Sequence, residues 1–189
     1  IQIGDWVLEE VCKYQRDWKL NGFRPVRIAV NISPKQFKQD DFVIKVEKVL
    51  ERYKINPKHI ELEITESSMV NVDETEGILN RLKALGVYVS VDDFGTGYSS
   101  LSYLKKYPID IIKIDQSFIA DINKDEKNEA IIKAIITLSK NLGMDVIAEG
   151  VEYTDQEQFL KQFNCHKGQG YLYNKPIPVE KIVEQYFML

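Results

Sequence analysis

Two adjacent aspartates, Asp92 and Asp93, stand between a β-branched segment and a loop that contains Gly95 and Gly97. Carboxylates this close repel each other unless a proton or a cation neutralises them. The glycines allow the backbone to approach whatever the carboxylates hold. The pair therefore suits a site with two metal ions, in which one carboxylate bridges the ions and its neighbour holds the second. The alternative is an acidic turn without a ligand, which an isolated Asp-Asp pair would favour.

The same kind of arrangement recurs at the ends of the other predicted strands. In chain order, the strand ends carry Asn31; Glu63, followed by Glu66; Asp92 and Asp93; Lys113 and Asp115; Glu149, followed by Glu152; and Gln169. A buried charge is costly unless it is paired or bound to a metal. In parallel α/β barrels the catalytic groups come from the C-terminal ends of the strands. A turn explains Asn31 or Gln169 alone equally well, but the whole series predicts one common site.

Oxygen ligands dominate this series, which indicates a hard cation such as Mg²⁺ or Mn²⁺. The isolated His59 and His166 disfavour a zinc site. Paired Mg²⁺ or Mn²⁺ ions stabilise the entering and leaving oxygens when a phosphodiester is displaced. Among the acids, Lys113 could orient the attacking water or stabilise developing charge, or it could form a structural ion pair. The residue types thus favour metal-dependent chemistry on a phosphodiester.

Strands and helices alternate along the chain and must position these residues. Strands are predicted over residues 26–30, 60–64, 87–91, 110–114, 145–148 and 168–172. Helices are predicted over 3–20, from a Ser33 cap with Pro34 in the first turn, over 75–85, after a cap at Ser99 or Ser100, and over 126–142, 155–163 and 179–187. Repeated strand–helix units imply parallel strands. No Rossmann or P-loop glycine pattern occurs, so a barrel is favoured over a doubly wound sheet.

Length and composition predict one α/β domain. The chain has 189 residues, of which 44% are hydrophobic, enough for one substantial core and short for two. A net charge of −4 argues against a nucleic-acid polymer as partner. No apolar run reaches membrane-spanning length. Cys12 and Cys165 form no disulfide framework or metal motif, which predicts a cytoplasmic location. Whether a parent protein is tethered to a membrane stays open.

The sequence resembles the bacterial EAL domains along essentially its whole length. The matching segments, in the family's order, are Val30-Asn31-Ile32-Ser33, Glu61-Leu62-Glu63-Ile64-Thr65-Glu66-Ser67, Asp92-Asp93-Phe94-Gly95-Thr96-Gly97-Tyr98-Ser99-Ser100-Leu101, Lys113-Ile114-Asp115, Ala148-Glu149-Gly150-Val151-Glu152 and Gln169-Gly170-Tyr171. EAL domains are phosphodiesterases that convert cyclic di-GMP to linear pGpG. The resemblance therefore implies a modified TIM barrel, a site for Mg²⁺ or Mn²⁺, and cyclic di-GMP as the substrate.

The resemblance also implies a set of metal ligands. Asn31, Glu63 and Asp92 would bind metal, and Asp92 would bridge to a second ion near Asp93. The loop that follows Asp93 links dimer contacts to metal binding in this family. A homodimer through that loop is therefore expected.

The remaining matching positions acquire roles in the same way. Lys113 would contact the attacking water. Glu149 would act at the metal–water centre as a general base, and Gln169 would hold the water or the shell of the second ion. Glu66 and Glu152 would anchor the loop that follows the paired aspartates.

Parts of the family pattern do not occur in this sequence. The Glu-Ala-Leu segment that names the family lies on an earlier strand, near an Arg-bearing segment that contacts the substrate, and neither is present. About two of the eight barrel strands are therefore expected to be missing. Residues 1–189 would form a partial EAL domain, a TIM-like barrel with about six strands. A smaller departure is Gln116, where the family often has Arg.

The absence of that segment affects the expected activity. One metal ligand is lost with it, so we expect weak or absent hydrolysis by this chain alone and a phosphodiesterase in the intact parent. One alternative is a receptor that binds cyclic di-GMP without cleaving it. A scaffold that needs neither metal nor nucleotide is a further alternative.

Overall fold

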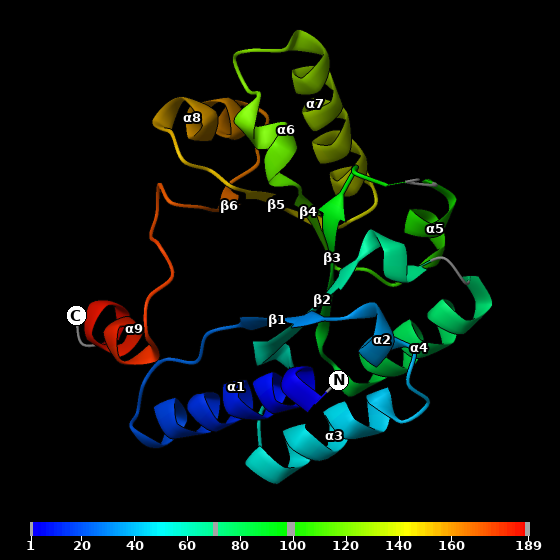
Figure 1. Cartoon of the computed structure of the whole chain (residues 1–189), viewed down its shortest axis with the longest axis vertical. Coiled ribbons are helices and arrows are strands. Elements are labelled where there is room, and N and C mark those ends of the chain that lie inside the picture. Colours follow the sequence, from blue (N-terminus) through cyan, green and yellow to red (C-terminus); the bar gives the residue numbers. More distant parts are fainter. Residues whose placement is uncertain (1, 70–71, 98–100, 188–189) are drawn as a thin grey trace.

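The computed structural model describes residues 2–69, 72–97 and 101–187. Within them, six parallel strands form one sheet in the order β1-β2-β3-β4-β5-β6. The strands are β1 (Ile28–Ile32), β2 (Ile60–Thr65), β3 (Tyr88–Phe94), β4 (Ile111–Ile114), β5 (Asp145–Glu149) and β6 (Lys167–Gln169). The sheet curls into half of a barrel, with β1 and β6 at its two edges (Figure 1). This arrangement confirms the predicted incomplete α/β barrel.

Helices alternate with the strands, and several of them pack against the outside of the curled sheet (Figure 1). They are α1 (Gln2–Leu20), α2 (Pro34–Phe37), α3 (Phe42–Tyr53), α4 (Val72–Leu85), α5 (Leu101–Lys106), α6 (Gln116–Ala120), α7 (Glu126–Asn141), α8 (Thr154–Gln162) and α9 (Val179–Tyr186), with 3-10 turns η1 (Pro57–His59) and η2 (Glu66–Met69). The cap predicted at Ser33 is confirmed, because its hydroxyl accepts from the Gln36 N–H. The alternative caps Ser99 and Ser100 lie outside the described residues.

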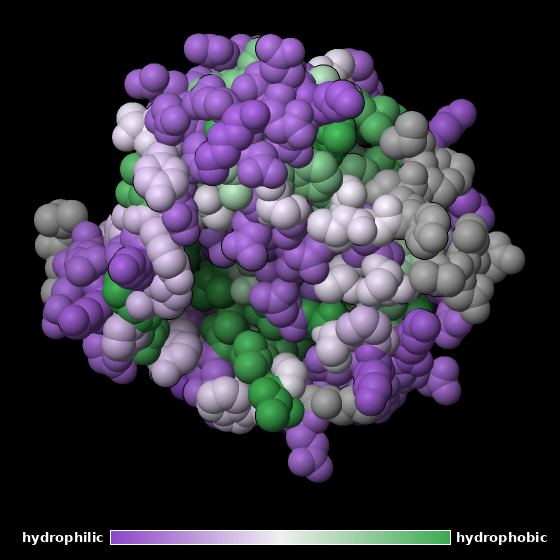
Figure 2. All heavy atoms as spheres, turned by 45° about the horizontal axis from the view of Figure 1, so that its top comes forward, coloured by the Kyte–Doolittle hydropathy of each residue, from purple (hydrophilic) through white to green (hydrophobic). Residues whose placement is uncertain are grey.

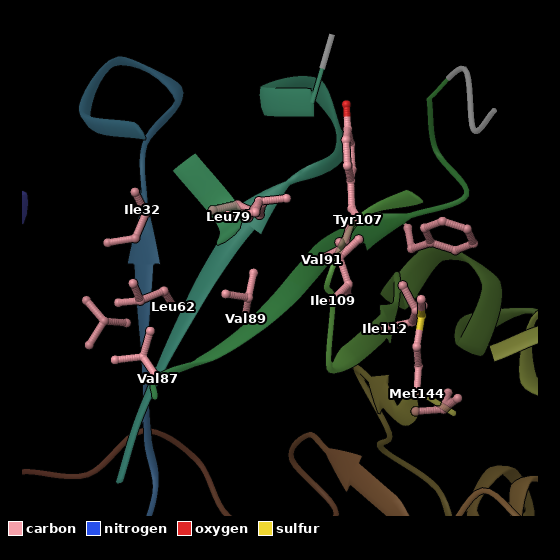
Figure 3. Packing of buried hydrophobic residues seen from close by; sticks show 14 of the residues in the cluster. Ile32, Leu62, Leu79, Val87, Val89, Val91, Tyr107, Ile109, Ile112 and Met144 are labelled. Atoms are coloured by element: carbon pink, nitrogen blue, oxygen red, sulfur yellow. The ribbon is translucent and has the colours of Figure 1, made fainter. Parts of the chain in front are cut away.

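Apolar side chains fill the space between the sheet and the helices. Successive residues of a strand point to opposite faces, so alternate strand residues belong to this layer. Leu62, Val89 and Ile112, from three neighbouring strands, are fully buried and lie in the packed cluster shown in Figure 3. The opposite face of β2 carries Glu61 and Glu63. The alternation therefore separates the hydrophobic core from a polar barrel interior.

The C-terminal helix α9 lies across the open side of the half-barrel (Figure 1). Phe187, which follows α9, contacts the end of α1 and the segment after it. Its ring centroid lies 4.9 Å from that of Trp18 and 5.4 Å from that of Phe23. Apolar side chains line a hollow beside α9 in the space-filling view (Figure 2). Aromatic contacts thus connect the last described residues to the first helix.

The observed strand bounds differ from the predicted ones, most of all at three strands. The first was expected over residues 26–30, but its pairing with β2 begins at Ile28 and continues to Ile32, so Asn31 lies inside the strand. The third was expected over residues 87–91, but β3 runs from Tyr88 to Phe94 and so includes Asp92 and Asp93. The last was expected over residues 168–172, but β6 ends at Gln169 because the chain turns there. Tyr173 N–H donates to Gly170 O in that turn. No helix among the described residues combines the length and the apolar character needed to cross a membrane.

Candidate active site

The C-terminal halves of the strands bring the predicted polar residues to one face of the sheet. Residues that pair in register on parallel neighbours point to the same face. Asn31 of β1 pairs with Glu63 of β2, and Glu149 of β5 pairs with Gln169 of β6. Asn31 and Gln169 are exposed on the edge strands, whereas Glu63 is buried. The predicted residues therefore extend from an exposed rim to a buried centre.

Lys113 of β4 occupies that centre, with 2% of its surface exposed. Its Nζ lies 2.7 Å from Glu63 Oε1, 2.6 Å from Glu149 Oε1 and 3.2 Å from Asp92 Oδ1. Lys113 thus forms ion pairs with three carboxylates, and hydrogen bonds connect it to Glu149 and Glu63. Buried charges are stable only when they are well compensated. Here one cation faces three carboxylates, which leaves an excess of acidic groups.

Burial and charge act in opposite directions on the pKa values of this group. Burial alone would lower the pKa of Lys113, but hydrogen bonds to Glu149 and Glu63 raise it well above its usual range. Burial raises the pKa of Glu149 to about 7; Lys113 opposes that rise and Asp92 adds to it. Burial also raises the pKa of Glu63, again against the effect of Lys113. The ammonium thus stays charged, while the carboxylates would be stabilised by a further cation.

A bulge near the end of β3 changes the direction of the paired aspartates. The register of β3 against β4 shifts between Val91 and Phe94, across Asp92 and Asp93. Asp93 has a left-handed backbone with φ of 55°, a conformation in which Asp is enriched among non-glycine residues. Adjacent side chains of a regular strand would point to opposite faces, and a bulge re-aims one of them. Both carboxylates can therefore approach the same site.

Carboxylate oxygens of Asp92, Asp93 and Glu149 lie within 4.8 Å of one another. Asp92 Oδ1 is buried and has no hydrogen-bond partner among the described residues, although it lies at ion-pair distance from Lys113. Burial and the charges of Asp92 and Asp115 raise the pKa of Asp93. Clustered carboxylates with an unused oxygen suit a hard divalent cation. The donor set therefore fits the metal that the sequence predicts.

Glu66 contacts the loop that follows β3. Gly95 N–H donates to Glu66 Oε2 at 3.3 Å. A Cβ atom placed on Gly97 would lie 3.1 Å from Glu66 Oε1, so the loop passes close to this buried carboxylate. The side chain of Glu152 is exposed, and its backbone N–H donates to Gln156 Oε1 at 2.9 Å. The geometry thus supports an anchoring contact by Glu66, while residues 98–100 of the loop lie outside the described part.

Gly150 and Gly170, for which the sequence predicted no role, bring the turns after β4, β5 and β6 into close contact. Gly150 has φ of 67°, and a Cβ on it would lie 2.6 Å from Gln116 Cβ. A Cβ on Gly170 would lie 2.1 Å from Val151 O, and Val151 N–H donates to Gln169 O at 3.0 Å. Each glycine directly follows a predicted site residue, so the close turn packing fixes both positions. The Glu-Gly and Gln-Gly pairs are the sequence signal for this packing.

Comparison with known proteins adds independent evidence. Residues 1–176 match the family described as EAL domain. The bifunctional diguanylate cyclase/cyclic di-GMP phosphodiesterase MucR of Pseudomonas aeruginosa is 43% identical over 184 residues, which are 97% of this chain and 27% of MucR. The chain spans about a quarter of the length of the curated relatives it matches.

Solved structures share the fold. The structure described as "PaMucR Phosphodiesterase, c-di-GMP complex" matches with a TM-score of 0.91 and 43% identity, over 96% of this chain and 74% of that one. The manganese/cy-diGMP complex of Klebsiella pneumoniae BlrP1 matches with a TM-score of 0.78 and 27% identity, over 89% of this chain and 44% of that one. Sequence, fold and strand-end residues agree, and the chain belongs to the EAL domain family.

Proposed function

We propose that the domain containing this chain hydrolyses cyclic di-GMP to linear pGpG in a metal-dependent reaction. The observation that carries the proposal is the buried group in which Lys113 contacts Glu63, Asp92 and Glu149. A receptor must recognise the nucleotide but does not need a buried cation among carboxylates with an unused oxygen. MucR is named a cyclic di-GMP phosphodiesterase, and its structure is a complex with that nucleotide, which supports the same substrate here.

We propose that Asn31, Glu63 and Asp92 would hold one Mg²⁺ or Mn²⁺ ion, and that Asp92 and Asp93 would hold a second. The donors are all oxygen atoms, which these hard cations prefer. The register of Asn31 with Glu63 places the amide on the same face as the carboxylates. When bound, such a pair of ions stabilises charge on the entering and leaving oxygens of the phosphodiester. The manganese complex of BlrP1 supports this choice of metal.

The chain's own groups then orient the water and move its proton. Lys113 and Glu149 lie 2.6 Å apart, so a water that contacts both meets an N–H donor and a carboxylate acceptor. Glu149 accepts a proton from this water as the water oxygen bonds to phosphorus. The bond between phosphorus and the ribose oxygen breaks, and the ribose oxygen leaves as an alkoxide that takes up a proton from solvent. Gln169, paired in register with Glu149, holds the water or the shell of the second ion. Lys113 remains protonated and stabilises the developing negative charge.

Residues 1–189 form, in this proposal, a single partial EAL domain that alone has weak or no hydrolytic activity. One hydrophobic cluster and one sheet run through the described residues. The sequence contains no Glu-Ala-Leu segment, so it lacks the metal ligand that this segment supplies in the family. Nucleotide or metal affinity can persist without that ligand, because the described carboxylates remain clustered.

Metal binding and product analysis test the proposed function. We expect calorimetry to show Mn²⁺ binding by the chain, and Asp92→Asn to weaken it about tenfold or more. The matched control Asp121→Asn, at an exposed position after α6, should leave the affinity unchanged. The parent protein should produce pGpG from cyclic di-GMP only with Mg²⁺ or Mn²⁺ present. Nucleotide binding by the parent without pGpG would instead establish a receptor, and binding of neither metal nor nucleotide would establish a scaffold.

The proposal also includes a homodimer formed through the loop after Asp93 in a cytoplasmic protein. The support is local: Glu66 contacts Gly95 of this loop and lies close to Gly97, so a change in the loop can reach the site. Light scattering on the purified chain, with and without Mn²⁺, measures the oligomeric state. A monomer at all protein concentrations would contradict the dimer without affecting the proposed chemistry.

A further inference from the structure

Besides Asp92 Oδ1, two buried polar atoms of the barrel interior lack a hydrogen-bond partner among the described residues. They are Glu61 Oε1 and Ser90 Oγ. Glu61 is 5% exposed and Ser90 is fully buried. Leaving such groups unpaired costs about 1–3 kcal/mol each, and native interiors rarely contain them. These two atoms therefore indicate a ligand between the strands that carry them.

The two residues occupy neighbouring strands on the interior face. Glu61 pairs in register with Tyr88, and Glu63 pairs with Ser90. Side chains two residues apart on a strand share a face, so Glu61 and Ser90 both point into the barrel, diagonally across β2 and β3. Ser90 is the register partner of Glu63. A ligand between Glu61 and Ser90 therefore lies next to Glu63, on the side toward the N-terminal end of β2.

The cations nearest to Glu61 leave this oxygen unpaired. Arg27 Nη1 lies 3.6 Å from Glu61 Oε2, and its guanidinium stacks on the ring of Tyr88, with 3.4 Å from Cζ to the ring centroid. Arg27 thus compensates the charge of Glu61 through the other oxygen only. Among the described residues Lys113 forms its ion pairs with Glu63, Asp92 and Glu149, and none with Glu61.

We propose that Glu61 and Ser90 hold one internal water molecule in the barrel interior. A water can donate to the Glu61 carboxylate and accept from, or donate to, the Ser90 hydroxyl. Buried waters typically make two to four hydrogen bonds to otherwise unpaired polar groups. A metal cation would need about six oxygen ligands, which a carboxylate oxygen and a hydroxyl do not provide. Glu61 and Ser90 are not among the proposed metal ligands, and the inference does not depend on the proposed function.

The sign of a stability change tests the proposal. Ser90→Ala should lower the melting temperature of the chain by about 3 °C, because it removes a partner of the water and leaves Glu61 unpaired. An unhydrated hydroxyl gives the opposite sign, since a methyl group relieves its desolvation cost. The control is Ser68→Ala, whose buried hydroxyl has a partner 3.1 Å away in Thr65 Oγ1. That variant should also melt at a lower temperature. A higher melting temperature for Ser90→Ala alone would overturn the proposal.

Magnetic relaxation dispersion of ¹⁷O-labelled water provides a second measurement that does not rely on stability. It counts long-lived internal waters, and we expect Ser90→Ala and Glu61→Leu each to remove one relative to the wild-type chain. An unchanged count in both variants would overturn the proposal. A melting temperature that rises with Na⁺ or K⁺ in the wild type but not in Ser90→Ala would also overturn it, in favour of a cation.

Discussion

The Lys113 ammonium and the Glu149 carboxylate, on neighbouring strands β4 and β5, lie 2.6 Å apart in the buried centre of the candidate site. Lys113 pairs in register with Ile147, so the ammonium reaches diagonally toward the end of β5. From there it also contacts Glu63 and Asp92 on β2 and β3. The lysine thus holds three converging strands together through charge, in addition to any chemical role.

The first prediction concerns removal of this cation. Lys113→Met keeps most of the side-chain volume but leaves the carboxylates of Glu63 and Glu149 buried without their partner. Removing one member of a buried ion pair costs about 3–5 kcal/mol, and we expect a loss of about that size in the free energy of unfolding of the metal-free chain. Urea denaturation followed by circular dichroism measures it.

Lys161→Met provides the matched control for the first prediction. Lys161 pairs with Glu157 on the surface of α8, and its side chain is 52% exposed. Such surface pairs contribute less than about 1 kcal/mol, so this variant should unfold near the wild-type midpoint. Equal unfolding midpoints for Lys113→Met and Lys161→Met would show that the buried ion pairs do not stabilise the fold.

The second prediction concerns the effect of pH on stability. Burial raises the pKa of Glu149 in the folded chain from an ordinary 4.5 to about 7. Between these values the unfolded state releases the proton first, so stability falls as pH rises from about 4.5 to about 7. The loss in unfolding free energy that comes from ionising Glu149 is complete above about pH 7 and reaches at most about 3 kcal/mol. Glu149→Gln cannot titrate and should gain stability relative to the wild type over this range. A wild-type-to-variant difference in unfolding free energy that is constant with pH would contradict the raised pKa.

Much of the fold could be predicted because each strand is a short β-branched or apolar run bounded by turn residues. The run ending at Asp92 and the segment containing Lys113 both become parallel strands, as expected. Helix ends could also be located, as the Ser33 cap shows. Strand runs and helix caps depend on residues close together in the sequence, so they can be predicted without knowledge of the fold.

The remaining features depend on contacts between segments distant in the sequence. The bulge at Asp92 and Asp93 arises from a register shift against β4, which no local pattern specifies. The convergence of three carboxylates on Lys113 requires the curvature of the sheet as well as its order. The unpaired Glu61 Oε1 is visible only once burial is known. Pairing and curvature, rather than residue type, decide these features.

The third prediction concerns the turn after β6. Gly170→Ala would place a Cβ 2.1 Å from Val151 O, a backbone atom that cannot move without displacing the turn after β5. We expect the variant to lose about 2 kcal/mol or more of stability and to weaken Mn²⁺ binding, because Glu149 directly precedes the displaced turn. Thermal unfolding and calorimetry measure the two effects.

Gly77→Ala is the matched control for the third prediction. Gly77 lies inside α4, and a Cβ there would meet no atom within 4 Å. Alanine should therefore stabilise this helix by about 0.5–1 kcal/mol without changing Mn²⁺ affinity. If both variants were stabilised, the close approach of Gly170 to Val151 would not constrain the turn.

The last prediction concerns the anchoring of the loop after β3. Glu66→Ala removes the acceptor of the Gly95 N–H, whose hydrogen bond is 3.3 Å long. Losing a bond of about 1 kcal/mol or slightly more corresponds to roughly tenfold faster amide hydrogen exchange at Gly95. Glu66→Gln, which keeps an acceptor without the charge, should give an intermediate rate.

Glu152→Ala tests the second anchor that the family resemblance implies. Its side chain is exposed, so the geometry predicts an unchanged rate. Faster exchange in Glu152→Ala but not in Glu66→Ala would transfer the anchoring role to Glu152 and contradict the assignment to Glu66.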